Sequence, residues 1–307
     1  MRNYKRKLRK TAFILMATAM VMLPLSCKTV DLRTDTIMEA SSTEKEIQVK
    51  KGYQFLEAAW KAQGMDKLES HKNYEFTGLE SWRSMMGKMA NPWRVNNVNL
   101  TFRYAINTFD GRVEIASGKD AGEFFGLQSW EYYEGNKATP ANFDLKKDKK
   151  RAFAVPTFHY FMELPNRLMQ APIKEYAGSD TILGQEYEMV IVTWGDDSEP
   201  TKEHDQYLVY INKDTKLIEI VSYSAHEGYL PGKHSLFGSI RYSDFKNIEG
   251  ILIPMKHESI FGNIKKEKKP IHTLQINSFE FDKVNQKILY PNPNLKKVGN
   301  NKINTDE

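Results

Sequence analysis

The feature that most constrains the fold is a long succession of segments in which apolar and polar residues alternate. One of them places apolar side chains at every second position, at Val98, Leu100, Phe102 and Tyr104, which is the period of a half-buried strand. Asp110-Gly111, directly after it, predicts a hairpin turn. Because the segments follow one another without a helix between each pair, they predict an antiparallel rather than a parallel sheet.

The remaining pattern predicts further strands and a few helices. We expect strands within residues 112–115, 126–133, 187–194, 206–211, 217–223, 237–242, 251–258 and 271–281. Helical spacing of apolar residues predicts helices within residues 43–64, 82–89 and 153–169, the last one interrupted at Pro165. The predicted fold class is α+β: a curved antiparallel sheet, an incomplete barrel of about nine to eleven strands, wrapped around two or three helices.

The charge of the chain is concentrated at its N-terminus. The formal net charge is +5, but six of the 44 basic residues lie within the first ten positions. The other 38 basic residues are balanced by 39 acidic ones. The body therefore has no charge excess that favours nucleic acid as a partner.

The N-terminal region predicts export and lipid attachment. After the basic residues comes an apolar stretch of 14 residues, Thr11 to Pro24, which fits a signal peptide and is short for a membrane span. The sole cysteine, Cys27, follows in Leu23-Pro24-Leu25-Ser26-Cys27. This resembles a bacterial lipobox, although Pro24 stands where leucine is usual. The resemblance implies a diacylglyceryl group on Cys27 and acyl chains such as palmitate, which anchor a protein to a membrane.

These observations divide the chain into four parts. We expect a lipoprotein signal peptide at residues 1–26, a lipidated tether at 27–42, the folded domain at 43–285 and a flexible C-terminal tail at 286–307.

Motifs of catalysis are largely missing, so the chain is not expected to be an enzyme or to hold a cofactor or metal. One acidic cluster could in principle bind a divalent cation, but its spacing is that of a solvated loop: Asp196, Asp197, Glu199, Glu203, His204 and Asp205. His159 is interpreted as a histidine at a helix–sheet boundary. A lysine-rich segment is interpreted as a charged hairpin tip, with an anionic headgroup as the alternative contact: Lys265, Lys266, Lys268 and Lys269.

The expected helices carry many methionine and aromatic residues. Such side chains either fill a core under the sheet or line an adaptable apolar cavity. For the second case we predict six lining residues, namely Trp60, Trp82, Met85, Met86, Phe158 and Met162.

Three segments of the chain resemble LolA-like proteins, the superfamily of outer-membrane lipoprotein carriers. They are Leu56 to Gly64 with Tyr74-Glu75-Phe76-Thr77-Gly78, Tyr207 to Thr215, and Tyr242 to Pro254. The resemblance covers about residues 45–283. It implies an incomplete barrel whose apolar cavity receives acyl chains of lipoproteins or lipids. The family's carrier is a soluble shuttle, whereas this chain is expected to be anchored, and no binding residue of the family can be matched here.

The resulting prediction is an outer-membrane lipoprotein, on the periplasmic face or the cell surface, that binds an acyl chain, a lipid or another lipoprotein without catalysis. The alternatives are a structural or assembly lipoprotein that uses its sheet as a protein-docking surface, and a hydrolase in which His204 and Asp205 meet another titratable side chain.

Overall fold

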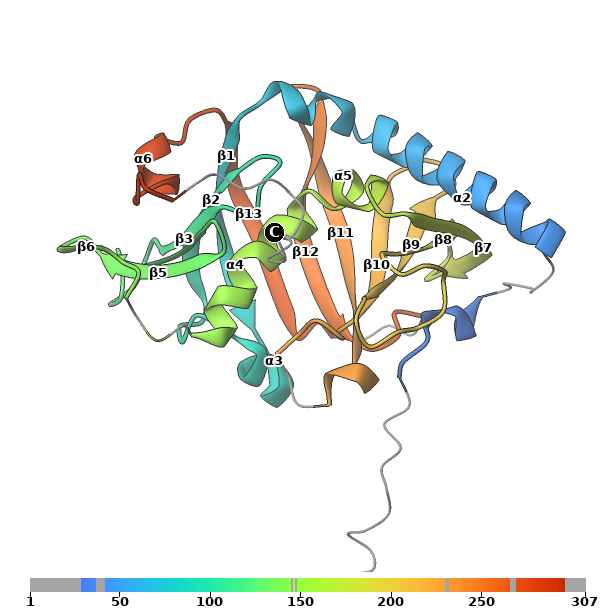
Figure 1. Cartoon of the computed structure of the whole chain (residues 1–307), viewed down its shortest axis with the longest axis horizontal. Coiled ribbons are helices and arrows are strands. Elements are labelled where there is room, and N and C mark those ends of the chain that lie inside the picture. Colours follow the sequence, from blue (N-terminus) through green and yellow to red (C-terminus); the bar gives the residue numbers. More distant parts are fainter. Residues whose placement is uncertain are drawn as a thin grey trace, which may run out of the picture.

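The computed structural model describes residues 29–36, 42–144, 146, 148–229, 232–265 and 269–295. Its strands form a single 13-stranded sheet in the order β6-β5-β4-β3-β2-β1-β13-β12-β11-β10-β9-β8-β7, and every strand pair is antiparallel. The sheet is open, with β6 and β7 at its two edges. It curves around two helices, α4 and α5, as Figure 1 shows.

The strands are β1 (Asn73–Trp82), β2 (Val98–Ala105), β3 (Gly111–Ile115), β4 (Phe124–Gln128), β5 (Glu131–Asn136), β6 (Thr139–Asn142), β7 (Ile173–Ile182), β8 (Gln185–Thr193), β9 (Gln206–Asn212), β10 (Ile218–Ser224), β11 (Phe237–Ile248), β12 (Ile251–Phe261) and β13 (His272–Phe281). The helices are α2 (Ser42–Ala62), α3 (Ser84–Ala90), α4 (Lys149–Met162), α5 (Leu164–Met169) and α6 (Gln286–Leu289), with short 3₁₀ helices η1 (Leu32–Asp35), η2 (Met65–Ser70) and η3 (Lys233–Ser235).

The predicted fold class is confirmed, while the strand number is higher than expected. The additional strands include β6 and β7. The sequence of β7 is rich in polar residues, and Glu175 within it is buried because its carboxylate accepts a hydrogen bond from Ser198 at 2.8 Å. Local hydrophobicity alone therefore did not mark this segment as a strand.

Helices α2, α4 and α5 cover one face of the sheet (Figure 1). Leu56 and Ala59 of α2 pack with Leu164 and Leu168 of α5 against β8, β9 and β10. Helix α4 begins at the side chain of Asp148, which accepts hydrogen bonds from the first backbone N–H groups. The predicted interruption at Pro165 is confirmed, since α5 starts there as a separate helix with proline in its first turn.

The segment predicted as a helix at 82–89 is shorter than expected. Trp82 is the last residue of β1 rather than helical, and α3 begins at Ser84. Ser84 has a φ of 61°, so the chain turns sharply out of the strand there and carries the three methionines away from the sheet.

Part of the expected tether is packed on the domain. The backbone N–H of Val30 donates to the carbonyl of His234 at 2.8 Å, and that of Leu32 donates to the side chain of Gln206 at 2.9 Å. Leu32 is 5% exposed and belongs to an apolar cluster on the opposite face of the sheet from α2 and α5, with Ile191 and Ile264 among its members. The expected signal peptide and Cys27 lie outside the described residues.

The first part of the expected C-terminal tail is likewise packed on the domain. Leu289 of α6 is completely buried against Ala105 and Val284. The side-chain amide of Gln128 donates to the carbonyl of Asn292 at 2.7 Å. These contacts explain why residues 286–295 are not a free tail; residues 296–307 lie outside the described part.

Candidate functional site

Three of the six predicted lining residues lie between the helices and the sheet. Trp60 and Phe158 are partly buried against the large apolar cluster that Met162 belongs to. The ring of Phe158 lies 5.2 Å from that of Phe102 on β2 and 5.8 Å from that of Trp93, measured between centroids. The indole N–H of Trp60 donates to Asn166 at 3.2 Å. These side chains join α2 and α4 to the sheet.

The space at the break between α4 and α5 is almost filled. Its volume is about 10 Å³, and it is lined by Gln63, Phe161, Met162, Leu164, Pro165, Ile218, Tyr242 and Pro254. A volume of this size holds about one water molecule, so the open apolar cavity expected from the sequence is not present at this break. Apart from the amide of Gln63 and the hydroxyl of Tyr242, the lining is apolar. We take this break as the candidate binding site.

The other three predicted residues lie at or just after the end of the central strand β1. Trp82 stacks on His272 at a centroid distance of 4.0 Å. Met85 and Met86 are 73% and 38% exposed on α3. These two methionines therefore line no space that the helices enclose with the sheet. His272 lies 5.7 Å from the ring of Phe158 on α4, so Trp82 is separated from the covering helix by that one ring.

A buried polar cluster lies under α4. His159, Glu163 and Arg167 follow one another at intervals of four residues, and each is at most 2% exposed. His159 Nε2 lies 2.8 Å from Glu163 Oε1, and Arg167 Nη2 lies 2.7 Å from Glu163 Oε2. The imidazole of His159 also stacks on the ring of Tyr104 at 4.3 Å. The four-residue spacing of these side chains within an apolar segment is the sequence signal that points to Glu163 and Arg167 in addition to His159.

The electrostatics of this cluster hold Glu163 ionised. Burial opposes ionisation, but the positive charge of Arg167 and the contact with His159 outweigh it, so the pKa of Glu163 is lowered. Burial lowers the pKa of His159 as well, against the attraction of Glu163. A neutral His159 therefore donates its Nε2 proton to the carboxylate, which can only accept. Glu163 and Arg167 therefore form a buried ion pair, and His159 donates a hydrogen bond to the same carboxylate. All three side chains are shielded from solvent.

The acidic cluster is distributed along the loop between β8 and β9. Among the described residues no group of three or more histidine, cysteine, aspartate or glutamate side chains is arranged to hold a metal ion. Glu199 pairs with Arg33 of the N-terminal segment at 2.5 Å. The carboxylate of Asp205 accepts hydrogen bonds from Ser224 at 2.9 Å and from the backbone N–H of His226 at 2.6 Å. These contacts fasten the loop and the N-terminal segment to the sheet.

Asp205 leads to a prediction about pH. Burial, helped by the negative charge of Glu227 and opposed by the hydrogen bonds from Ser224 and His226, raises the pKa of Asp205 to about 6. The folded state therefore binds a proton that the unfolded state releases near pH 4, and stability falls as the pH rises from about 4 to about 6, by up to about 3 kcal/mol. In Asp205→Asn this decrease should disappear. Urea unfolding across that pH range measures it.

The control for this prediction is Glu69→Gln, which changes an exposed carboxylate on η2. This variant should keep the wild-type slope. An Asp205→Asn protein with an unchanged slope between pH 4 and 6 would show that another group titrates.

The lysine-rich segment is only partly described. Lys265 pairs with Asp180 of β7 at 2.8 Å, and Lys269 is exposed, while Lys266 and Lys268 lie outside the described residues. Lys265 therefore helps to connect the β12–β13 loop to the edge strand β7.

Within the described residues, no helix combines the length and the apolar character needed to cross a membrane.

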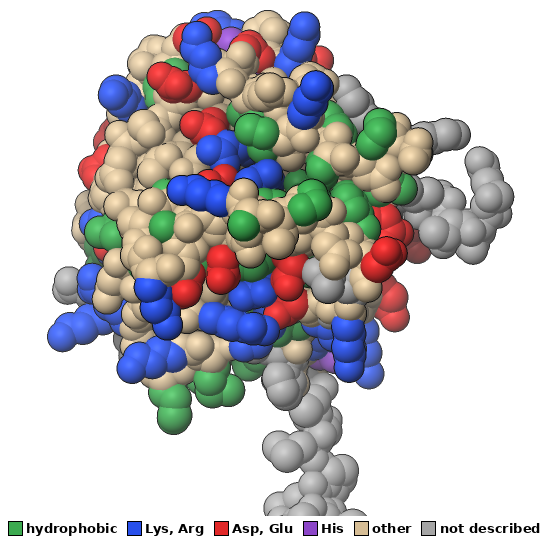
Figure 2. Space-filling view, turned by 90° about the vertical axis from the view of Figure 1, so that its left-hand side faces the viewer, with side chains coloured by type: hydrophobic (Ala, Val, Ile, Leu, Met, Phe, Trp, Pro, Cys, Tyr) green, Lys and Arg blue, Asp and Glu red, His purple; other side chains and the backbone are tan. Residues whose placement is uncertain are grey.

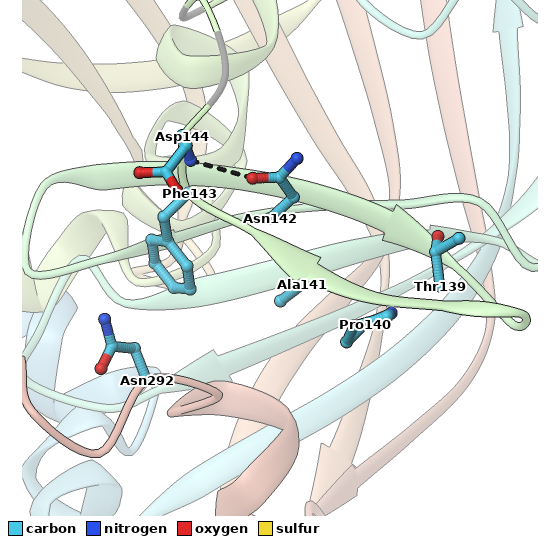
Figure 3. A pocket seen from close by; sticks show the side chains of 7 residues that line it. All are labelled: Thr139, Pro140, Ala141, Asn142, Phe143, Asp144 and Asn292. Atoms are coloured by element: carbon cyan, nitrogen blue, oxygen red, sulfur yellow. Dashed lines mark hydrogen bonds between the residues drawn. The ribbon is translucent and has the colours of Figure 1, made fainter.

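A larger, open pocket lies beside the edge strand β6. Its volume is about 480 Å³. Figure 3 shows its lining, in which Phe143 points its ring toward the segment that carries Asn292, and Asn142 accepts a hydrogen bond from the backbone N–H of Asp144 at 3.0 Å. The other lining residues are Thr139, Pro140 and Ala141. Because most of these side chains are exposed, the pocket has no buried polar group that would orient a ligand.

The fold and the site together define an open antiparallel sheet with an apolar, helix-covered face. No family model and no curated protein matches the sequence. Among solved structures, the chain is similar to a LolA superfamily protein from Nitrosomonas europaea, at 12% identity and a TM-score of 0.46, with 77% of this chain and 96% of that chain covered. It is also similar to a DUF1329 family protein from Desulfovibrio piger, at 12% identity and a TM-score of 0.49, with coverages of 79% and 97%. The first belongs to the superfamily that the sequence segments resemble. These likenesses concern the fold alone.

Proposed function

We propose that the chain is a non-catalytic lipoprotein of the bacterial cell envelope, anchored through Cys27, whose body takes up an acyl chain at the break between α4 and α5. The observation that carries the proposal is this break. There a covering layer of two short helices is interrupted over an apolar sheet face, and the remaining gap is lined by Phe161, Met162 and Leu164.

Uptake of a ligand requires movement of side chains at the break. Met162 is unbranched and can repack at low cost. Helix α5 is well anchored, since five of its six residues are buried, so the first movement falls to the side chain of Met162 at the end of α4. An acyl chain would extend the gap along the sheet by displacing Met162 and the neighbouring helix ends.

The arrangement of titratable groups supports a non-catalytic role. The buried pair of His159 and Glu163 is out of reach of a substrate in solution. Asp205 is held by Ser224 and His226, while the side chain of His204 is not among its partners. These contacts favour a structural use of the residues that a hydrolase would need.

The uptake of an acyl chain can be tested on residues 28–307 by titration with a fluorescent fatty acid and by native mass spectrometry. We expect Met162→Ala to bind the fatty acid several-fold more tightly than the wild type, because it enlarges the gap. The matched control is Met189→Ala, which opens a similar space in the cluster on the opposite face of the sheet. Equal affinities of both variants, or a protein that stays empty at every concentration, would contradict the proposal.

The anchor is tested separately by the intact mass of the mature protein. A diacylglyceryl group on Cys27 should be found, and Cys27→Ala should leave the membrane fraction. A mature chain without acyl groups that still sediments with membranes would contradict this part.

A second candidate function is that of an assembly lipoprotein. The observation that favours it is the exposed methionine surface of α3 combined with the closed interior. A protein partner recovered with the wild type but not with Met85→Asp would favour this candidate over ligand uptake.

A further inference from the structure

Helix α3 presents apolar side chains to solvent while it is firmly attached to the domain. Met85, Met86 and Met89 are 73%, 38% and 52% exposed. On its opposite side, the helix packs closely on Ile271 at Gly87. A Cβ atom at this position would lie 2.5 Å from the carbonyl oxygen of Ile271, so only glycine fits. The methionines therefore remain exposed for lack of anything to cover them within the described residues.

The attachment of α3 is reinforced by contacts to its backbone. Lys150 donates to the carbonyl of Met89 at 2.7 Å, and the hydroxyl of Tyr229 donates to the carbonyl of Ala90 at 2.6 Å. The backbone N–H of Arg83 donates to Ile271 at 2.7 Å. These contacts fix α3 to the domain, so a surface that binds the methionines also holds the domain.

The N-terminal segment lies at the same end of the strands. The last residue of β1, which leads into α3, pairs with the first residue of β13, and the backbone N–H of Leu32 donates to the side chain of Gln206, the first residue of β9 at this end. In Figure 1, α3, η3 and the start of the described chain all lie at the lower side. Figure 2 shows hydrophobic side chains protruding at the lower edge of the molecule, the edge to which α3 belongs.

The chain before Thr29 limits how far this edge can lie from the anchor. Cys27 precedes Thr29 by two residues, and two residues span at most about 7 Å. If Cys27 carries its lipid in a membrane, as the proposed function states, the edge with α3 is held against the bilayer surface. From this placement we propose that α3 inserts Met85 and Met89 into the interfacial region of the membrane that holds the anchor.

Basic side chains surround the methionines. Arg83 and Lys88 flank them, and Lys269 is exposed two residues before Ile271, which contacts Gly87 of α3. The exposed Glu199 of the β8–β9 loop is paired with Arg33 and does not balance these charges. Anionic lipid should therefore strengthen the contact at low salt, while the apolar insertion of the methionines persists at high salt.

The insertion can be measured on the full lipidated chain. Cys27 is the only cysteine, and in the lipidated chain its thiol would carry the lipid, so Met85→Cys supplies a single site for an environment-sensitive fluorophore. The control is Lys246→Cys, an exposed position on β11 next to the β11–β12 turn, at the opposite end of the strands from α3. Both proteins are reconstituted in vesicles of phosphatidylcholine, and in vesicles of phosphatidylethanolamine and phosphatidylglycerol.

We expect the emission at position 85 to shift to the blue and to be quenched by brominated acyl chains in both vesicle types, at low and at high salt. The label at position 246 should remain in water. Aqueous emission at position 85 in a vesicle-bound protein would overturn the inference, and so would a label that is shielded but not quenched by lipid, which would indicate a protein or a second copy on α3.

A variant without the anchor separates this inference from the proposed function. If intact mass shows no lipid on Cys27, the double variant Cys27→Ser, Met85→Cys is titrated with excess vesicles. Quenching at position 85 in that protein would keep the insertion of α3 and discard the anchor, whereas its absence would overturn the insertion.

Discussion

Replacing Glu163 by alanine is expected to lower the free energy of unfolding by about 3–5 kcal/mol, because it leaves a buried charge without its partner. The guanidinium of Arg167 is 2% exposed, and its contact with Glu163 is 2.7 Å long. The same carboxylate orients His159. Urea unfolding of residues 28–307 near neutral pH measures the effect.

The matched control is Glu57→Ala. Glu57 and Lys61 on α2 have the same four-residue spacing, with 2.9 Å between their charged atoms, but Lys61 is largely exposed. An exposed helix pair of this kind contributes about 0.3–0.5 kcal/mol. If Glu163→Ala and Glu57→Ala lower the free energy of unfolding by similar amounts, the burial of the His159–Glu163–Arg167 cluster has no energetic role.

A double substitution tests the physical reason behind the first prediction. In Glu163→Met, Arg167→Met no charge is left unpaired, and apolar replacements of buried ion pairs are often close to neutral. The double variant should therefore be more stable than Glu163→Ala. A double variant that is less stable would assign the loss to packing and to the hydrogen bond from Arg167 to the carbonyl of Thr108.

Much of the fold could be predicted because the period of two is a local property. Residues 98–104 show it clearly, since β2 buries one face against the helices and keeps the other partly exposed. The turn at residues 212–215 was also predictable, because Asn212 accepts hydrogen bonds from the backbone of Asp214 and Thr215 within the turn itself.

The site was harder to predict because it depends on which elements meet. The apolar spacing of Met85 and Met86 is the same whether they face a core or solvent, and the contact of Gly87 with Ile271 decides between the two. Phe158 faces the sheet, but Trp93, which the sequence did not single out, fills the space beside it. Local patterns contain no information on such volumes, so an open cavity was expected where the structure is packed.

Two glycines that lie far apart in the sequence, Gly64 and Gly250, meet in the structure. Gly64 ends the helix α2, as expected, with a φ of 74°, and Gly250 turns the chain from β11 into β12 with a φ of 87°. The backbone N–H of Leu252 donates to the carbonyl of Gln63 at 2.8 Å. A Cβ atom on Gly64 would lie 2.1 Å from the carbonyl oxygen of Gly250. The two glycines thus allow the end of α2 to touch the β11–β12 turn.

This contact predicts a large effect for Gly64→Ala, which can be separated from backbone strain by Gly184→Ala. Gly184 has a φ of 85° and nothing within 4 Å of an added Cβ atom, so its substitution should cost only the strain of a left-handed residue, about 1–2 kcal/mol. Gly64→Ala adds the displacement of the β11–β12 turn, about 1–3 kcal/mol more. Urea unfolding of both variants measures the difference. Equal losses would mean that α2 can withdraw from the turn freely, and the close approach of the two glycines would then have no part in holding α2 over the sheet.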